Sequence, residues 1–128
     1  MDKAQTGRLG EDFCEKYYIK RGFSTVQRNY HSRFGEIDLI CENSDFLAFV
    51  EVKTRKADSI TQPCEAVDLR KQKRIVRTAQ MFLLENETDK QPRFDVFEVF
   101  VNEGRVFKFN LIENAFDESC FGGYDELF

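Results

Sequence analysis

The sequence predicts one α/β domain, a mixed β-sheet flanked by helices. Segments with helical and with strand periodicity follow one another in the order α-β-β-β-α-β-β, and this alternation is typical of sheets that are covered by helices. The 128 residues can bury a real core, and fourteen phenylalanines supply its aromatic side chains. We expect the domain to span residues 1–116, followed by an acidic and aromatic tail at residues 117–128.

Residues 3–21 have the spacing of an amphipathic helix. Leu9, Phe13 and Tyr17 recur every four residues, which places them on one face. Gly22 follows as a residue suited to end the helix in the left-handed conformation. Glu11 is expected at the edge of the apolar stripe.

Three strands are predicted next. Residues 24–30 form the first, and the runs 35–40 and 46–53 are separated by turn-forming residues at 43–45. The second and third strands should therefore form a hairpin.

The hairpin places charged side chains together. If Ser44 and Asp45 form its tip, Asp38 lies opposite Glu51 and Glu36 lies opposite Lys53, with opposed Cβ atoms about 5 Å apart. We favour an ion pair between Glu36 and Lys53, and the alternative is that Glu36 is itself a metal ligand.

These charges stand in apolar runs, where burying them is costly unless they pair or bind a metal. Two adjacent carboxylates repel each other, so we expect a raised pKa at one of them. A divalent cation would relieve the repulsion, and Mg²⁺ is commonly held by one or two carboxylates. The pattern predicts a site for Mg²⁺ or Mn²⁺ at Asp38 and Glu51, with Lys53 beside it to bind a phosphate or activate water. The alternative is a surface hairpin with an ordinary salt bridge.

Residues 65–85 predict a long second helix, and residues 93–101 and 105–111 predict two more strands around a turn. The buried stripe of the helix is expected to contain Leu69, Gln72, Val76, Ala79 and Leu83, flanked by Ile75 and Phe82. Phe94, Phe97 and Phe100 of the following strand are expected in the core.

Basic residues offer phosphate contacts despite the net charge of −4. All 19 lysines and arginines precede residue 109, and five of the 23 acidic residues lie from Glu113 onward, so the body is nearly neutral. Local basic clusters can still bind a phosphate backbone in a salt-sensitive way. The candidates are Arg55 and Lys56 after the hairpin, Lys71 at the edge of the polar helix face, and Arg70, Lys73, Arg74 and Arg77 on that face. The alternative for this face is simple solvation.

The remaining features exclude other classes of site. The cysteines at positions 14, 41, 64 and 120 are scattered, which favours buried thiols in a reducing cytoplasm over zinc binding or disulfides. His31, the only histidine, is expected in a solvated loop. No apolar run has membrane length and the N-terminus is charged, so we expect a cytoplasmic protein without membrane contact.

Several of these motifs occur in the same order in a known family. They are Gly7–Glu11, Arg28–Tyr30, Gly35–Ile40, Phe49–Arg55, Arg93–Val96 and Ile112–Phe116. Over residues 5–116 the chain resembles the YraN family of small bacterial proteins. That family has a restriction-endonuclease-like fold of the PD-(D/E)xK superfamily and is similar to archaeal Holliday-junction resolvases. Ile37-Asp38 stands in the Pro-Asp position, and Glu51-Val52-Lys53 stands as the ExK motif.

The resemblance implies a metal-dependent endonuclease that acts on DNA, with branched or damaged DNA as candidate substrates. It adds Glu11 as a helix carboxylate that completes a metal site with Asp38 and Glu51, and it makes Lys53 the catalytic lysine. Junction-resolving relatives act as dimers, so a homodimer is an expectation by analogy. Two alternatives stay open: a non-catalytic nucleic-acid-binding module, and a protein-interaction module that binds its partner through the C-terminal tail.

Overall fold

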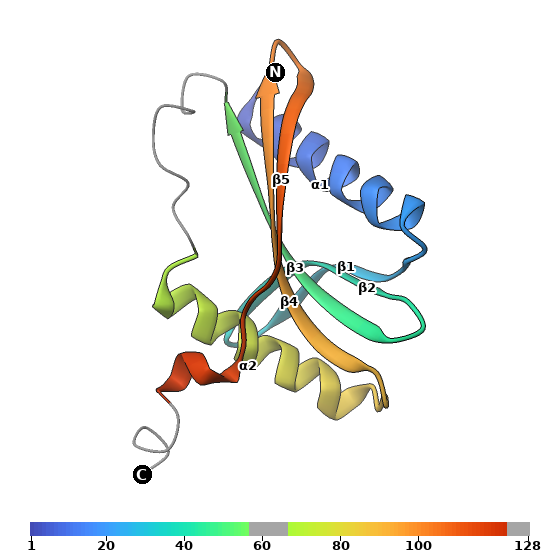
Figure 1. Cartoon of the computed structure of the whole chain (residues 1–128). Coiled ribbons are helices and arrows are strands. Elements are labelled where there is room, and N and C mark those ends of the chain that lie inside the picture. Colours follow the sequence, from blue (N-terminus) through green and yellow to red (C-terminus); the bar gives the residue numbers. More distant parts are fainter. Residues whose placement is uncertain (57–66, 123–128) are drawn as a thin grey trace.

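A five-stranded mixed sheet with a helix on each face is the framework of the protein (Figure 1). The computed structural model describes residues 1–56 and 67–122. Along the chain its elements are α1 (Lys3–Lys20), β1 (Ser24–Ser32), β2 (Gly35–Glu42), β3 (Phe46–Lys56), α2 (Leu69–Glu85), β4 (Gln91–Asn102), β5 (Arg105–Phe116) and the 3₁₀ helix η2 (Glu118–Phe121). The predicted fold class and element order are confirmed.

The strands lie in the order β1-β2-β3-β4-β5. β1–β2, β2–β3 and β4–β5 are antiparallel, whereas β3 and β4 are parallel, from Phe46 opposite Gln91 to Lys56 opposite Val101. A parallel pair needs a long crossover connection, and α2 lies in that connection on one face of the sheet. The other face is covered by α1, as the edge-on view of the sheet shows (Figure 1).

The β2–β3 hairpin has the predicted register. Its ladder runs from Glu42 opposite Leu47 to Leu39 opposite Val50. The side-chain oxygen of Asn43 accepts hydrogen bonds from two backbone N–H groups of the turn, at 2.9 and 2.7 Å, which fixes the loop length and with it the register. The ladder ends one residue short of the two candidate carboxylates.

Local capping explains where α1 begins and ends. Asp2 and Gln5 form a reciprocal capping box at its N-terminus. At the other end Gly22 has a φ of 90°, and the backbone N–H of the residue after it donates to the carbonyl of Tyr18, which is a Schellman termination. The helix packs through Cys14 and Tyr18 against a core that includes Phe97.

The second helix begins later than predicted. Asp68 is its N-cap and accepts a hydrogen bond from the backbone N–H of Lys71 at 2.8 Å, so the helix starts at Leu69. The prediction that Leu69 is buried is wrong, because its side chain is 53% exposed and Val67, before the cap, enters the core instead. The expected inner face is otherwise present, with Ile75, Val76, Ala79 and Phe82 buried.

The core contains the expected aromatic and thiol side chains. Phe94, Phe97 and Phe100 of β4 are buried. Cys14 and Cys41 are buried free thiols and Cys120 of η2 is buried as well, whereas Cys64 lies outside the described residues. Part of the tail is thus packed against α2, and residues 123–128 are not described.

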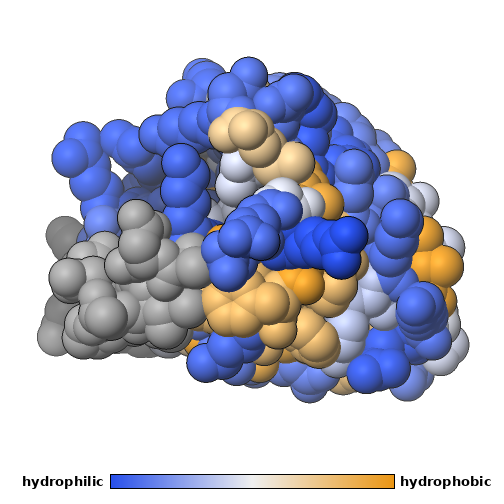
Figure 2. All heavy atoms as spheres, turned by 90° about the horizontal axis from the view of Figure 1, so that it is seen from above, coloured by the Kyte–Doolittle hydropathy of each residue, from blue (hydrophilic) through white to orange (hydrophobic). Residues whose placement is uncertain are grey.

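The face of the molecule seen from above is largely polar. Viewed from above, hydrophilic residues cover most of the molecule and hydrophobic ones form smaller areas between them (Figure 2). Among the exposed apolar side chains are Phe107 and Phe109 of the edge strand β5. No helix within residues 1–56 and 67–122 is long and apolar enough to cross a membrane.

The contact between α1 and β3 gives a first prediction. A methyl group added at Gly10 would collide with the side chain of Thr54, whereas one added at Gly7 would have no atom within 4 Å. Gly10→Ala should therefore lower the free energy of unfolding by about 1–3 kcal/mol. The matched control Gly7→Ala should raise it by about 0.5–1 kcal/mol, because alanine favours the helix. Urea denaturation of both variants measures the difference, and equal effects would contradict the close packing.

Candidate functional site

Asp38 lies where β2 separates from β3. Its Oδ2 accepts a hydrogen bond from the backbone N–H of Val52 at 2.8 Å. Backbone N–H groups of a strand point toward the neighbouring strand in the plane of the sheet, so the carboxylate takes the place of a β2 backbone acceptor beyond the last ladder pair. This contact holds the side chain beside Glu51, whose charge acts on it. The two candidate carboxylates are therefore adjacent, as the hairpin register predicts.

The pair is electrostatically unfavourable when both groups are charged. Glu51 is buried and Asp38 is partly buried. Burial and the charge of Glu51 raise the pKa of Asp38 to about 7, with a smaller contribution from Glu11, while the Val52 N–H opposes the rise. The expected raised pKa is confirmed.

A lysine from α2 approaches the pair. The Nζ of Lys71 lies 2.6 Å from Oε1 of Glu51. Burial alone would lower the pKa of Lys71, but the hydrogen bond to Glu51 and the charges of Glu51, Asp38 and Glu36 raise it above its ordinary value. The ammonium group thus supplies positive charge where the sequence predicts a metal ion. Its side chain is still 48% exposed, so it can also reach a ligand in the solvent.

Lys53 lies on the same face of β3 as Glu51, because side chains two residues apart share a face. It is partly buried, and within residues 1–56 and 67–122 it forms no ion pair. The expected pair with Glu36 is wrong: the Oε2 of Glu36 lies 3.4 Å from Nδ1 of His31, its partner across the β1–β2 ladder. The part of β2 before Leu39 does not pair with β3, and there Glu36 pairs with His31 of β1.

His31 is exposed as expected, but it belongs to strand β1 rather than to a loop.

Glu11 contacts an arginine. Its Oε1 lies 3.3 Å from Nη2 of Arg28, which also contacts Asp12 at 2.8 Å and Glu15 at 3.3 Å. Sequence reasoning did not foresee this arginine, although Arg28 belongs to one of the motifs that carry the family resemblance. Glu11 therefore has a cation partner of its own.

The position of Glu11 separates it from Glu51. Glu11 lines a cavity of about 550 Å³ together with Val52 and Thr54, whose side chains alternate with those of Glu51 and Lys53, so it lies on the opposite face of β3. In the described part of the chain no three His, Cys, Asp or Glu side chains are grouped closely enough to hold a metal. A role for Glu11 as third ligand stays a prediction.

Glu98 is a buried acid that sequence reasoning missed. It is 1% exposed on β4, opposite Lys53 in the parallel register. Asn110 donates a hydrogen bond to its Oε1 at 3.1 Å, whereas its Oε2 has only the Nε of Arg55 at 3.5 Å and no hydrogen bond. The sequence feature that could have predicted Glu98 is the one that pointed to Asp38: a single carboxylate within an apolar run, here residues 96–101.

The expected phosphate-binding residues are divided between two places. Arg55 is mostly covered and pairs with Glu98, while Lys56 is exposed and lines the cavity beside Glu11. Arg70, Lys73, Arg74 and Arg77 lie on the outer face of α2 and line a larger pocket.

Asp95 is a buried carboxylate whose hydrogen bonds give it a structural role, and it can be compared with Asp38 and Glu51. It is fully buried, and it accepts hydrogen bonds from the hydroxyl of Tyr18 at 2.7 Å, from Arg93 at 2.9–3.2 Å and from the backbone N–H of Asn114 at 2.9 Å. Each of these hydrogen-bond partners is a donor. Asp38 and Glu51, by contrast, face each other, which stability alone does not favour.

The raised pKa of Asp38 predicts a specific pH dependence of stability. The folded state holds this proton more tightly than the unfolded state, in which the pKa is near 3.8, so the group lowers the free energy of unfolding as pH rises from about 4 to about 7. Asp38→Asn keeps an acceptor for the Val52 N–H and removes the repulsion. We expect it to stabilise the protein at pH 8 by about 2 kcal/mol and to have little effect at pH 4.

Urea denaturation at pH 4.5, 6 and 8 measures this difference. Asp89→Asn, at an exposed position, is the matched control and should give a difference that does not grow with pH. An Asp38→Asn effect that is constant or falls with pH would contradict the buried acid pair.

Comparisons with known proteins give the family. Residues 10–99 match the family described as "Uncharacterised protein family UPF0102". A UPF0102 protein of Desulforapulum autotrophicum is 44% identical over 115 residues, which is 89% of this chain and 94% of the relative. Relatives from Dictyoglomus turgidum and Caldanaerobacter subterraneus are 38% and 40% identical over 118 and 119 residues, 91% of this chain and 100% and 98% of the relatives. The chain therefore belongs to the UPF0102 family, the YraN-like family that its motifs indicate.

Proposed function

We propose that this protein is a metal-dependent nuclease of the PD-(D/E)xK type that hydrolyses phosphodiester bonds in DNA. Asp38 and Glu51 would hold Mg²⁺ or Mn²⁺, and Lys53 would be the catalytic lysine. The observation that carries the proposal is the adjacent, buried carboxyl pair beside two lysines. Perturbed acids grouped in this way are typical of functional sites.

The donor set fits a hard divalent cation. Carboxylate oxygens are the ligands that Mg²⁺ and Mn²⁺ prefer, and one or two of them suffice when waters and substrate phosphates complete the shell. In the free protein the raised pKa of Asp38 and the ammonium group of Lys71 limit the negative charge of the pair. A bound divalent ion would lower the pKa of a water molecule and stabilise negative charge on the attacked phosphate.

The two lysines would have different tasks. Lys53 lies on the face of Glu51 and forms no ion pair with another described residue, so its ammonium group can orient the attacking water or contact a phosphate oxygen. Lys71 is tied to Glu51 and half exposed. It would keep the acid pair compact in the free protein and contact the phosphate when substrate is bound. Glu98 places a buried negative charge opposite Lys53.

One observation favours a second candidate function. Because Lys71 already neutralises Glu51, the pair is compatible with a protein that binds nucleic acid without metal and without catalysis. Such a module would keep the fold and the basic surface. Association into a dimer, and partner binding through residues 117–128, are further proposals that leave the site unchanged.

Metal binding is the first test. Millimolar Mn²⁺ should raise the melting temperature of the wild type by several degrees, since a ligand at 10–100 times its Kd adds about 1.4–2.7 kcal/mol to stability. Asp38→Ala should abolish the shift and Asp89→Ala should retain it. Because a metal competes with the proton on Asp38, the Mn²⁺ affinity measured by calorimetry should fall up to tenfold from pH 8 to pH 6. An unchanged melting temperature in Mn²⁺ would count against the metal site.

Strand cleavage separates an enzyme from a binding module. Lys53→Ala should reduce cleavage by about 10²–10⁴-fold and leave Mn²⁺ binding intact, because the two carboxylates remain. Asp38→Ala should lose both. DNA binding should survive in both variants, since most phosphate contacts lie elsewhere. If the wild type cuts neither RNA nor linear, nicked, flapped or four-way DNA with Mg²⁺ or Mn²⁺, the enzyme proposal fails and the binding module takes its place.

A further inference from the structure

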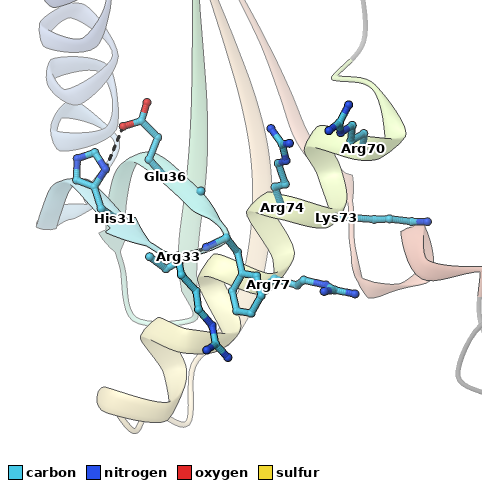
Figure 3. A pocket seen from close by; sticks show the side chains of 10 residues that line it. His31, Arg33, Glu36, Arg70, Lys73, Arg74 and Arg77 are labelled. Atoms are coloured by element: carbon cyan, nitrogen blue, oxygen red, sulfur yellow. Dashed lines mark hydrogen bonds and ion pairs between the residues drawn. The ribbon is translucent and has the colours of Figure 1, made fainter.

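A basic groove lies between the β1–β2 turn and the outer face of α2. Its volume is about 760 Å³. The groove is defined here by the side chains that carry its positive charge and its aromatic surface: Arg33 and Phe34 from the turn, and Arg70, Lys73, Arg74 and Arg77 from the helix (Figure 3). Glu36 adds one negative charge to its lining. The sequence predicts that the basic residues of the helix share one face, but it does not predict that the β1–β2 turn lies opposite them.

We propose that the basic groove binds the phosphates of a single-stranded nucleic-acid segment and guides it toward the Asp38–Glu51 pair. The proposal rests on the proposed nuclease function and names the form of substrate that the site takes. A substrate with both single-stranded and double-stranded parts, such as a flap or a branch, would be favoured over a continuous duplex.

The four arginines of the groove are not neutralised by ion pairs with other described residues. In residues 1–56 and 67–122, Arg33, Arg70, Arg74 and Arg77 form no ion pair. Arg28 and Arg93, on other parts of the surface, contact three carboxylates and one carboxylate respectively. Like charges three and four residues apart on a helix destabilise it by about 0.2–0.5 kcal/mol per pair. An anionic ligand would reverse that cost.

Both walls of the groove are fixed before a ligand binds. The hydroxyl groups of Ser32 and Thr78 are 3.0 Å apart, and the Ser32 hydroxyl accepts a hydrogen bond from the backbone N–H of Phe34 at 3.0 Å. A Cβ at Gly35 would lie 3.6 Å from Arg74, so the turn rests closely on the helix. Little ordering entropy is therefore lost on binding, which favours affinity.

Aromatic rings support the arginines. The guanidinium carbon of Arg33 lies 4.9 Å from the ring centre of Phe34, and that of Arg77 lies 5.7 Å from Phe34 and 5.1 Å from Phe121. A guanidinium group over a ring keeps its N–H donors at the edge of its plane, where they can bind phosphate oxygens. The partly buried Phe34 ring also offers a surface for base stacking.

The distribution of charge favours a strand over a single anion. In Figure 3, Arg70 and Arg74 extend to one side, Lys73 and Arg77 extend toward the C-terminal 3₁₀ helix, and Arg33 points in a third direction. Cations spread in this way match successive phosphates rather than one ion. A pocket of this size accommodates a few flexible nucleotides, whereas a rigid duplex would touch only its rim.

The groove is adjacent to the acid pair. Arg70 directly precedes Lys71, which contacts Glu51. Glu36 lines the groove and also acts electrostatically on Lys71. A strand that lies along α2 in the groove therefore reaches the candidate site without crossing the sheet.

The test compares DNA forms with charge-matched variants. Fluorescence anisotropy measures binding of the full-length protein to a labelled 12-nucleotide single strand, the corresponding duplex and a flap. The groove variant is Arg74→Gln with Arg77→Gln. The control is Arg8→Gln with Arg105→Gln, two exposed arginines outside the groove. We expect the groove variant to lose at least tenfold affinity for the single strand and the flap, to change less than threefold for the duplex, and to lower the salt slope by about 1.4. The control should change less than threefold for every DNA.

Further arms separate the outcomes. Arg74→Lys with Arg77→Lys, which keeps the charge, should restore part of the affinity, and melting curves check that each variant is folded. Four results would each overturn the proposal. The first two are an equal loss of affinity in the groove variant and the control, and an equal loss for single strand and duplex. The other two are displacement of the strand by inorganic phosphate at equivalent phosphate concentration, and no single-strand binding by the wild type. Mn²⁺ binding should be unchanged in the groove variant. Failure of the nuclease proposal would instead appear as absent metal binding and cleavage while groove binding persists.

Discussion

The hydrogen bond from the backbone N–H of Val52 to Asp38 is the contact on which the candidate site depends. It forms because the residues of β2 before Leu39 do not pair with β3, which leaves a backbone N–H of β3 whose hydrogen bond the carboxylate accepts. A buried N–H must find an acceptor, so the backbone itself fixes the side chain beside Glu51. The separation of β2 from β3 and the position of the acid pair therefore have the same structural cause.

The free-energy cost of this feature is what distinguishes it from the rest of the core. Asp95 is buried more deeply, yet it accepts hydrogen bonds from Tyr18, Arg93 and Asn114 and needs no ligand to be stable. Asp38 and Glu51 instead repel each other, which raises the pKa of Asp38, and Lys71 is the cation that contacts Glu51. Glu98 keeps one oxygen without a hydrogen bond. These carboxylates near one region of β3 therefore lack a full set of hydrogen-bond donors. A site that binds and releases cations would require such carboxylates.

The sequence predicted those parts of the fold that local patterns determine. Asn43 and the alternation of β2 and β3 determine the hairpin register, and the spacing of Ile75, Val76, Ala79 and Phe82 determines the inner face of α2. Contacts that depend on how elements cross were not predictable from local patterns. Lys71 reaches Glu51 because of the place at which α2 meets the sheet, and Glu36 meets His31 because β2 diverges from β3. Glu11 meets Arg28 across α1 and β1 for the same kind of reason.

Helix α2 links the acid pair to the basic groove. Consecutive residues on a helix are separated by about 100°, so Lys71 turns toward Glu51 while its neighbour Arg70 and the arginine one turn further, Arg74, face the groove. The inner face of the helix is held by Ile75, Val76 and Ala79 in the core, which fixes the rotation of both sets of cations at once. A chain with a net negative charge can thus present a local positive surface beside a buried negative pair. The rigid packing of one helix, rather than the overall charge, determines where a phosphate backbone would bind relative to the carboxylates.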